Sequence, residues 1–131
     1  MSEKQVEIVQ SMYAAFSDGD ADDALAHFDP DVRVDVTRRV DGGRGQGRQE
    51  LAALIGQWVA TFENWREDIE EIRDLDPFVC VVATQRGRGK GSGLDVETRY
   101  AVIYEVRAGK IVSMTLFPDP GEALAAAGAD G

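Results

Sequence analysis

The side chains of this sequence that combine a reactive group with apolar neighbours are mainly tyrosines. Tyr13 lies in an apolar N-terminal stretch, and Tyr100 and Tyr104 lie in a later stretch of alternating residues. A phenol in such a setting can stabilise an oxygen that becomes negatively charged. Asp35, between two valines, is a general base if burial raises its pKa. Asp35, Tyr13, Tyr100 and Tyr104 are therefore the catalytic candidates.

Each catalytic candidate also has a purely structural interpretation. Strand alternation would turn Asp35 towards water together with Arg33 and Thr37, opposite the valines. A β-bulge would reverse that orientation. The tyrosines are typical amphipathic core residues, with a buried ring and a paired hydroxyl. Both interpretations remain open at this level.

Other reactive residue types favour structural roles. His27, the single histidine, lies beside Phe28 at an expected helix end, where its charged form suits the helix dipole. Cys80 lies in the most apolar stretch and is expected to be a small core residue. One histidine and one cysteine cannot form a zinc or iron pattern, and 44–47 lacks the spacing of a phosphate-binding loop. We therefore expect no metal and no cofactor.

Length and charge exclude several classes of protein. We expect 131 residues to form a single domain, 1–131. A net charge of −10 disfavours nucleic-acid binding, which needs a basic face. No apolar run approaches the roughly 20 residues needed to span a bilayer. The N-terminus lacks the basic and apolar regions of a signal peptide, so a cytoplasmic location and no membrane partner are expected.

The order of the expected elements indicates an α+β domain. Periodicity and capping residues predict helices first, three strands in a row near the end, and a short final helix. Helices followed by an antiparallel meander favour one curved, cone-shaped sheet wrapped around the N-terminal helices. The expected helices are 3–16, 21–27, 48–62 and 122–127, the expected strands 32–37, 65–75, 78–84, 96–106 and 111–117, and the expected glycine-rich loop 39–47.

Several segments resemble the SnoaL-like branch of the nuclear transport factor 2-like superfamily, which includes ketosteroid isomerases. They are QSMYAAFSDGD at 10–20, FDPDV at 28–32, GKIVSM at 109–114 and DPGEAL at 119–124. The resemblance covers nearly the whole chain and implies a cone-shaped α+β fold with a deep apolar pocket. It implies little about the reaction, because this scaffold hosts isomerases, cyclases, epoxide hydrolases, dehydratases and binders that catalyse nothing.

The resemblance also excludes the isomerase mechanism. The isomerase tyrosine corresponds to Met12, its proton-abstracting aspartate to Val36, and its protonated aspartate to Val102. None of these side chains transfers a proton. Tyr13 is one position away from the tyrosine site, about 100° around a helix.

The resemblance predicts a pocket for a largely hydrophobic small molecule, lined by Met12, Phe16, Val36, Trp58, Cys80, Val82, Thr84, Tyr100, Val102, Tyr104, Met114 and Leu116. Three functions follow. The protein is an enzyme for proton-transfer, cyclisation or hydration chemistry on an apolar ligand, a non-catalytic binder or sensor, or a protein-interaction module. A small-molecule pocket protein whose enzyme activity stays open ranks first, a pure binder second and the interaction module third.

Apolar residues on both faces of the last strands predict a homodimer. Val79, Val81 and Ala83 alternate with Cys80 and Val82. We assign the first three, together with Ala101, Ile103 and Phe117, to the convex face of the sheet. An apolar patch with a charged rim favours pairing of two identical surfaces.

Overall fold

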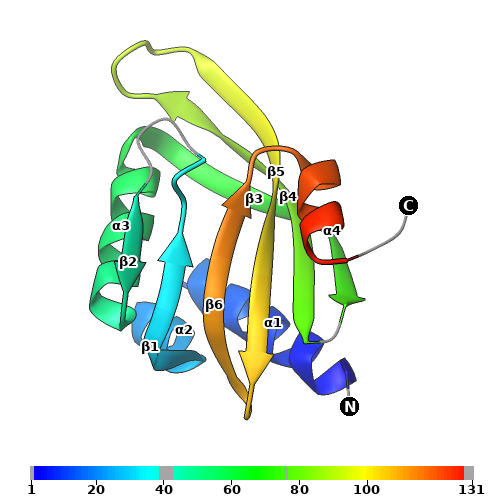
Figure 1. The fold of residues 1–131 in the computed structure, drawn as a ribbon. Coiled ribbons are helices and arrows are strands. Elements are labelled where there is room, and N and C mark those ends of the chain that lie inside the picture. Colours follow the sequence, from blue (N-terminus) through cyan, green and yellow to red (C-terminus); the bar gives the residue numbers. More distant parts are fainter. Residues whose placement is uncertain (1, 39–42, 76, 129–131) are drawn as a thin grey trace.

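A computed structural model describes residues 2–38, 43–75 and 77–128. Its helices are α1 (Ser2–Ser17), α2 (Ala21–Ala26), α3 (Arg48–Ala60) and α4 (Pro120–Ala126). Its strands are β1 (Phe28–Asp35), β2 (Arg44–Gln46), β3 (Phe62–Leu75), β4 (Phe78–Gly89), β5 (Asp95–Arg107) and β6 (Lys110–Phe117). The expected α+β arrangement, with helices packed on a curved sheet, is confirmed (Figure 1).

Turn and capping residues mark the ends of helices α1, α2 and α3. Gly19 adopts a φ of 78° after α1, a conformation that costs glycine little. Asp20 then caps α2, accepting a hydrogen bond from the Asp23 backbone N–H at 3.0 Å. Gly47, with a φ of 91°, precedes α3 in the same way. The turns after α1 and before α3 thus determine where α1 ends and where α3 begins.

The sheet has six strands in the order β2-β1-β6-β5-β4-β3. All neighbours are antiparallel except β1 and β6, which pair in parallel. β4 and β5 form a long hairpin in which β4 continues to Gly89, beyond the strand end at 84 that the sequence predicts. β2 lies inside the expected 39–47 loop, and 39–42 fall outside the described residues.

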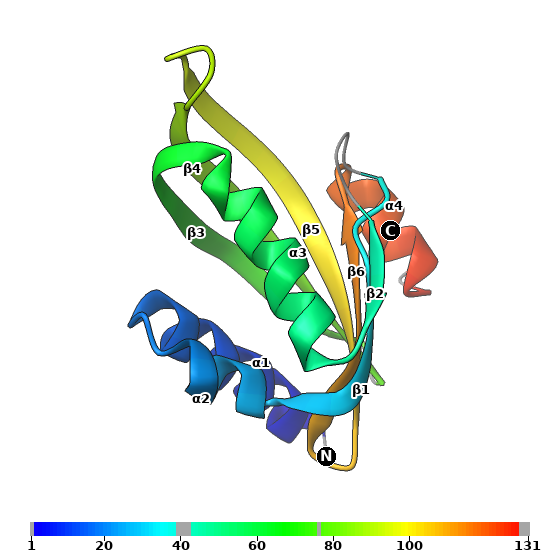
Figure 2. The same cartoon turned by 90° about the vertical axis from the view of Figure 1, so that its left-hand side faces the viewer.

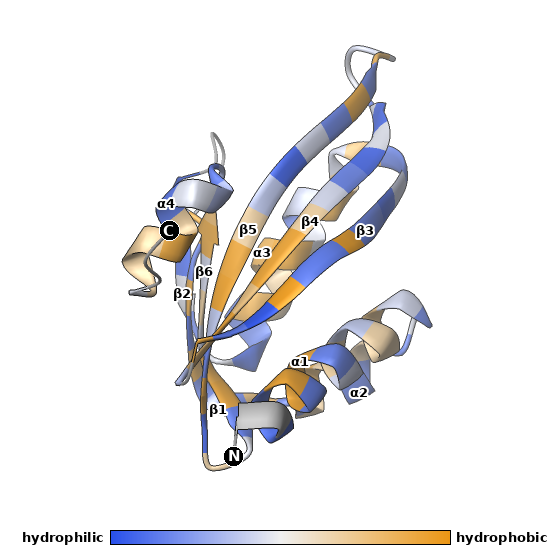
Figure 3. Cartoon of the chain, turned by 90° about the vertical axis from the view of Figure 1, so that its right-hand side faces the viewer, coloured by the Kyte–Doolittle hydropathy of each residue, from blue (hydrophilic) through white to orange (hydrophobic). Residues whose placement is uncertain are grey.

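The three helices α1, α2 and α3 lie on one side of the sheet and α4 on the other (Figure 2). We call these the concave and convex sides. Hydrophobic residues concentrate in the lower parts of β4 and β5, and hydrophilic ones towards their joining hairpin (Figure 3). The larger core cluster fills the concave side and includes Val9, Val32, Leu51, Val79, Val81, Ala83, Tyr100, Val102 and Tyr104.

The assignment of faces in β4 was wrong by one residue. Val79, Val81 and Ala83 belong to the concave core, where Val79 pairs with Tyr104 and Val81 with Val102 in register. Cys80 and Val82 belong to a second cluster on the convex side. Because both sets are apolar, alternation alone could not fix which set faces the helices.

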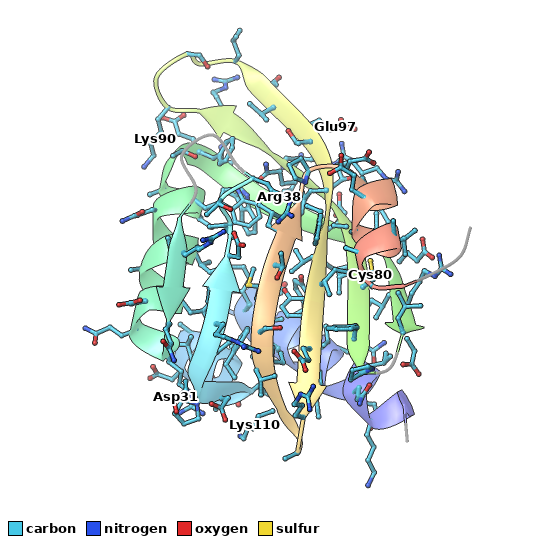
Figure 4. All side chains as sticks on the ribbon, viewed as in Figure 1. Asp31, Arg38, Cys80, Lys90, Glu97 and Lys110 are labelled. Atoms are coloured by element: carbon cyan, nitrogen blue, oxygen red, sulfur yellow. The ribbon has the colours of Figure 1, made fainter. Side chains whose placement is uncertain are left out.

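The convex apolar residues already have a cover within the chain. Ala101, Ile103 and Phe117 lie with Cys80 and Val82 in the second cluster, which also contains Ala123 of α4. All of them are at most 6% exposed. In Figure 4 the Cys80 side chain lies beside α4. The apolar patch behind the homodimer prediction is therefore explained by α4.

The homodimer itself stays a prediction. The convex surface is further occupied by ion pairs, such as Arg33 with Glu105 at 3.7 Å and Arg86 with Glu97 at 2.6 Å. Light scattering decides the question, since a dimer has twice the 14.3 kDa mass of one chain. Among the described helices, none is long and apolar enough to cross a bilayer.

Candidate functional site

The concave side holds a pocket of about 440 Å³ between the helices and the sheet. Its wall is overwhelmingly apolar, and its polar side-chain groups come from Tyr13, Tyr104, Glu67 and the two tryptophan indoles. Lining residues come from α1, α2, α3, β1, β3, β5 and β6, and include Met12, Phe16, Leu25, Phe28, Leu51, Ile55, Trp58, Trp65, Val102 and Met114. Such a volume and wall suit a largely hydrophobic small molecule.

The structure brings half of the expected lining residues to the pocket. Met12, Phe16, Trp58, Val102, Tyr104 and Met114 line it. Val36, Tyr100 and Leu116 are buried in the concave core but do not border the cavity. Cys80 and Val82 lie in the convex cluster, and the Thr84 hydroxyl donates to Glu70, so these three are corrected. They share the one-residue shift of β4.

Two phenols meet inside the pocket. The hydroxyls of Tyr13 and Tyr104 lie 2.6 Å apart, and their rings pack edge to face with centroids 6.0 Å apart. Although Tyr13 is one position away from the isomerase tyrosine site, it still reaches the cavity from α1. Burial raises the pKa of both phenols, so both stay protonated at neutral pH. One hydroxyl donates to the other, which leaves one phenolic proton for a ligand.

Glu67 is a pocket carboxyl group that is not among the catalytic candidates predicted from the sequence. It lies on β3 and pairs in register with Gln85 of β4. No hydrogen bond or ion pair joins Glu67 to another described residue. Desolvation raises its pKa from 4.5 to about 7, and its charge in turn raises the pKa of Tyr13 and Tyr104. A carboxyl group with a pKa near neutrality can both accept and donate a proton.

The sequence did carry a signal for Glu67. Trp65, Glu67 and Ile69 alternate, so a strand that turns the Trp65 ring inward also turns Glu67 inward. The signal is weak because charged residues surround Glu67 on both sides. Register shifts before Arg66 and after Ile69 further obscure which face each residue takes.

One amide organises the tryptophan wall. Gln85 is buried at 7% exposure on the concave side of β4. Its Oε1 accepts a hydrogen bond from Trp58 Nε1 at 2.8 Å and from Trp65 Nε1 at 3.0 Å. The two rings meet at 69°, and Phe16 packs on Trp65 at 70°. Since both indole N–H groups are engaged, the tryptophans present carbon surfaces to the cavity.

Asp35 lies outside the pocket lining, on the solvent side of β1. It accepts hydrogen bonds from Thr37 Oγ1 at 2.6 Å and from Thr37 N at 3.0 Å. Arg44 Nε is 3.5 Å from its carboxylate. The Thr37 hydrogen bonds, aided by Arg44, lower the pKa of Asp35. Its surroundings thus match the alternation reading rather than that of a desolvated base.

The remaining candidates have structural contacts. Tyr100 is 3% exposed and packs on Trp58 with ring centroids 5.2 Å apart. Its hydroxyl has no hydrogen-bond partner among the described residues and does not border the pocket. His27 caps α2 and donates from Nδ1 to the Asp23 carbonyl at 2.8 Å. Neither residue is placed to share a reaction with Glu67.

Within the described residues, no three side chains of the metal-binding types gather closely enough to hold an ion. The polar chemistry of the pocket therefore rests on one carboxyl group and two phenols. Together they can move a proton at one point of a ligand and stabilise negative charge at another.

Solved structures share this fold over almost the full chain. A provisionally assigned polyketide cyclase from Xanthomonas campestris is 24% identical, with a TM-score of 0.72 over 96% of this chain and 98% of that one. TerC, crystallised with polyporic acid, is 19% identical, with a TM-score of 0.75 over 95% and 98%. A protein with a ketosteroid isomerase-like fold from Catenulispora acidiphila, in complex with trimethylamine, is 22% identical, with a TM-score of 0.73 over 95% and 94%.

At these identities the likeness is one of fold. None of the curated proteins gives a match. The family model for the SnoaL-like domain, however, matches residues 9–114, which span α1 to the middle of β6 and include every polar group of the pocket. The chain therefore belongs to the SnoaL-like family.

Proposed function

We propose that this protein is an enzyme that catalyses proton transfer on a hydrophobic small molecule, with Glu67 as the general base and acid. The observation that carries the proposal is the desolvated Glu67 carboxyl group inside an apolar pocket, within electrostatic reach of the Tyr13–Tyr104 pair. Enolisation and aldol-type ring closure are the reactions that such a set of groups serves best. Relatives of the same fold include a provisionally assigned polyketide cyclase.

The roles follow from the protonation states. Glu67, with a pKa of about 7, is partly ionised at neutral pH, and its carboxylate accepts a proton from a C–H bond next to a carbonyl group. The electrons of that bond move onto the carbonyl oxygen. The free phenolic proton of the Tyr13–Tyr104 pair donates a hydrogen bond to this oxygen. Glu67 then returns the proton at another atom of the ligand or of the ring that forms.

The apolar wall supports this chemistry. Without water, a carboxylate is a stronger base, and hydrogen bonds to a developing oxyanion are worth more than in solvent. Trp58, Trp65 and Phe16 hold the ligand by contact area, and Gln85 fixes the two indoles. The ligand is therefore oriented by shape, and the reaction occurs at the edge where Glu67 lies.

The proposal can be tested without the natural substrate. 5-Nitrobenzisoxazole is a neutral aromatic probe: a base removes the proton on C3, the ring N–O bond breaks, and a coloured cyano-nitrophenolate forms. We expect turnover by the wild-type protein and a loss of about 10²- to 10⁴-fold in Glu67→Gln, because the amide cannot accept the proton. The Asp35→Asn variant should convert the probe at the wild-type rate. Equal rates in the wild type and Glu67→Gln would contradict the assignment.

A non-catalytic binder is the second candidate. The extent of apolar wall relative to the few polar groups favours it, since apolar contact alone is sufficient for ligand retention. In that case the probe binds in the pocket, seen as quenching of the fluorescence of Trp58 and Trp65, but is not converted.

A further inference from the structure

We propose that the ligand of this pocket is a hydrophobic organic cation, an amine or quaternary ammonium compound. Its charged group would lie between the Glu67 carboxylate and the rings of Trp65 and Phe16. The proposal rests on the proposed function in using the same pocket, and it adds the chemical class of the molecule that enters.

The charges around the pocket favour a positive ligand. Glu67 is the one carboxylate in the lining, and the described lining residues include no lysine, arginine or histidine. Its neighbour Asp68 lies outside the lining and pairs with Arg86 at 3.0 Å. The groups that face Glu67 from other elements are Tyr13 of α1, Gln85 of β4 and Tyr104 of β5, all uncharged. A ligand cation would supply the counter-charge that the described protein residues do not.

The aromatic wall favours a cation for a second reason. Trp58, Trp65 and Phe16 border the same space with their rings steeply inclined, at 69° and 70°. Inclined aromatic rings around one cavity form the walls of a cage, and ring faces attract organic cations. Trp65 and Glu67 are two residues apart on β3, so cage and carboxylate adjoin.

The same wall disfavours an anion. Gln85 accepts both indole N–H groups, so neither is available to a ligand carboxylate or phosphate. The Tyr13–Tyr104 pair leaves one phenolic proton as the donor to a ligand. An acid in this pocket would meet one hydrogen-bond donor and a repelling carboxylate. At about 440 Å³ the cavity also has room for a hydrophobic body attached to the cation.

Three naphthalene probes of similar size test the charge preference at pH 8, where Glu67 is ionised. They are trimethyl(1-naphthylmethyl)ammonium, 1-naphthalenemethanol and 1-naphthoate, with dissociation constants measured by titration calorimetry. We expect the ammonium probe to bind about tenfold more tightly than the alcohol. Naphthoate should bind more weakly than either.

Two variants assign the preference to the pocket. Glu67→Gln should lower the affinity for the ammonium probe about tenfold and change the affinity for the alcohol by no more than about twofold. Glu71→Gln is the matched control: it makes the same change on the same strand, but Glu71 lies outside the pocket, beside Arg73 at 3.7 Å. It should change neither affinity.

Each remaining outcome overturns the cation proposal. These outcomes are naphthoate binding as tightly as the ammonium probe, an unchanged ammonium affinity in Glu67→Gln, and no binding of any probe. They leave the proposed function to its own test, because 5-nitrobenzisoxazole is neutral. Conversely, charge-selective binding without conversion of 5-nitrobenzisoxazole supports a cation binder that is not an enzyme.

Discussion

Carboxyl groups on the two sides of the sheet have opposite surroundings: several of those outside the pocket lie beside arginines, and the one in the pocket does not. On the convex side Glu105 lies within reach of Arg33 and Arg107, and at the outer edge Asp35 lies beside Arg44. On the concave side Glu67 lines the pocket and has no ion pair with a described residue. The pKa of Asp35 is lowered and that of Glu67 is raised to about 7. Paired carboxylates hold a structure, whereas an unpaired one in a cavity is available for chemistry.

The two sides also differ in how well they are filled. α4 closes the convex side with small residues such as Ala123, and the residues beneath it are fully or nearly fully buried. On the concave side three helices cover the sheet but leave the 440 Å³ pocket. Folding can be optimised on one side while the other keeps space for a ligand. The variants below test that division.

The largest effect is expected from Phe117→Ala on the convex side. Phe117 is 6% exposed, and the Arg38 guanidinium lies 4.4 Å from its ring centroid. Removing the ring leaves a cavity that should cost about 3–5 kcal/mol of unfolding free energy. Urea denaturation measures this loss. The molecules that remain folded should convert the benzisoxazole probe at the wild-type rate, and a slower rate would contradict the division.

Glu67→Gln should stabilise the protein at pH 8. The pKa of Glu67 is raised in the folded state, so the folded state binds the proton more tightly than the unfolded chain, and stability falls as the pH rises from about 4.5 through 7. The amide has no charge to desolvate. We expect a gain of at most about 3 kcal/mol at pH 8, and close to none at pH 4.

Denaturant unfolding of the wild type and of Glu67→Gln at pH 8 and pH 4 measures this difference in the free energy of unfolding. Glu71→Gln, the same change on the convex side, should leave the pH dependence as in the wild type. Equal stabilities of the wild type and Glu67→Gln at pH 8 would show that Glu67 is well solvated.

The pH dependence of probe conversion should follow Glu67. Because the carboxylate form is the base, the rate rises with pH through a midpoint of about 7 and is about 100-fold higher at pH 9 than at pH 5. Asp35→Asn and His27→Gln should keep this profile, since neither residue borders the pocket. If the rate of His27→Gln no longer depended on pH, His27 at the end of α2 would be the base instead of Glu67.

The smallest effect is expected at Gly56 on α3. Gly56 lines the pocket, and a Cβ there would meet no atom within 4 Å. Gly56→Ala should therefore stabilise the helix by about 0.5–1 kcal/mol without changing probe affinity. Gly56→Phe should weaken the ammonium probe by filling the cavity. If thermal melts showed that Gly56→Ala is less stable than the wild type, the space beside Gly56 would be too small for a methyl group.

Much of the fold could be predicted from residue patterns. Apolar spacing and caps located the helices within a few residues, and the expected breaks after 16 and after 106 separate α1 from α2 and β5 from β6 within a residue or two. The strict alternation of 32–37 also supported one of the two readings of Asp35, in which it faces water. Local periodicity suffices where one face is apolar and the other polar.

Tertiary structure decided the points where both faces looked alike. In β4 an apolar residue stands at every position from Phe78 to Ala83, so only pairing with β5 and the cover by α4 set the inward face. In β3 two register shifts interrupt a charged sequence, so only the opposition of Glu67 and Gln85 turned that carboxyl group inward. The two-residue period of a strand determines that side chains alternate between the two faces, but not which of the two sets faces inward. In β3 that choice placed the Glu67 carboxyl group in the pocket.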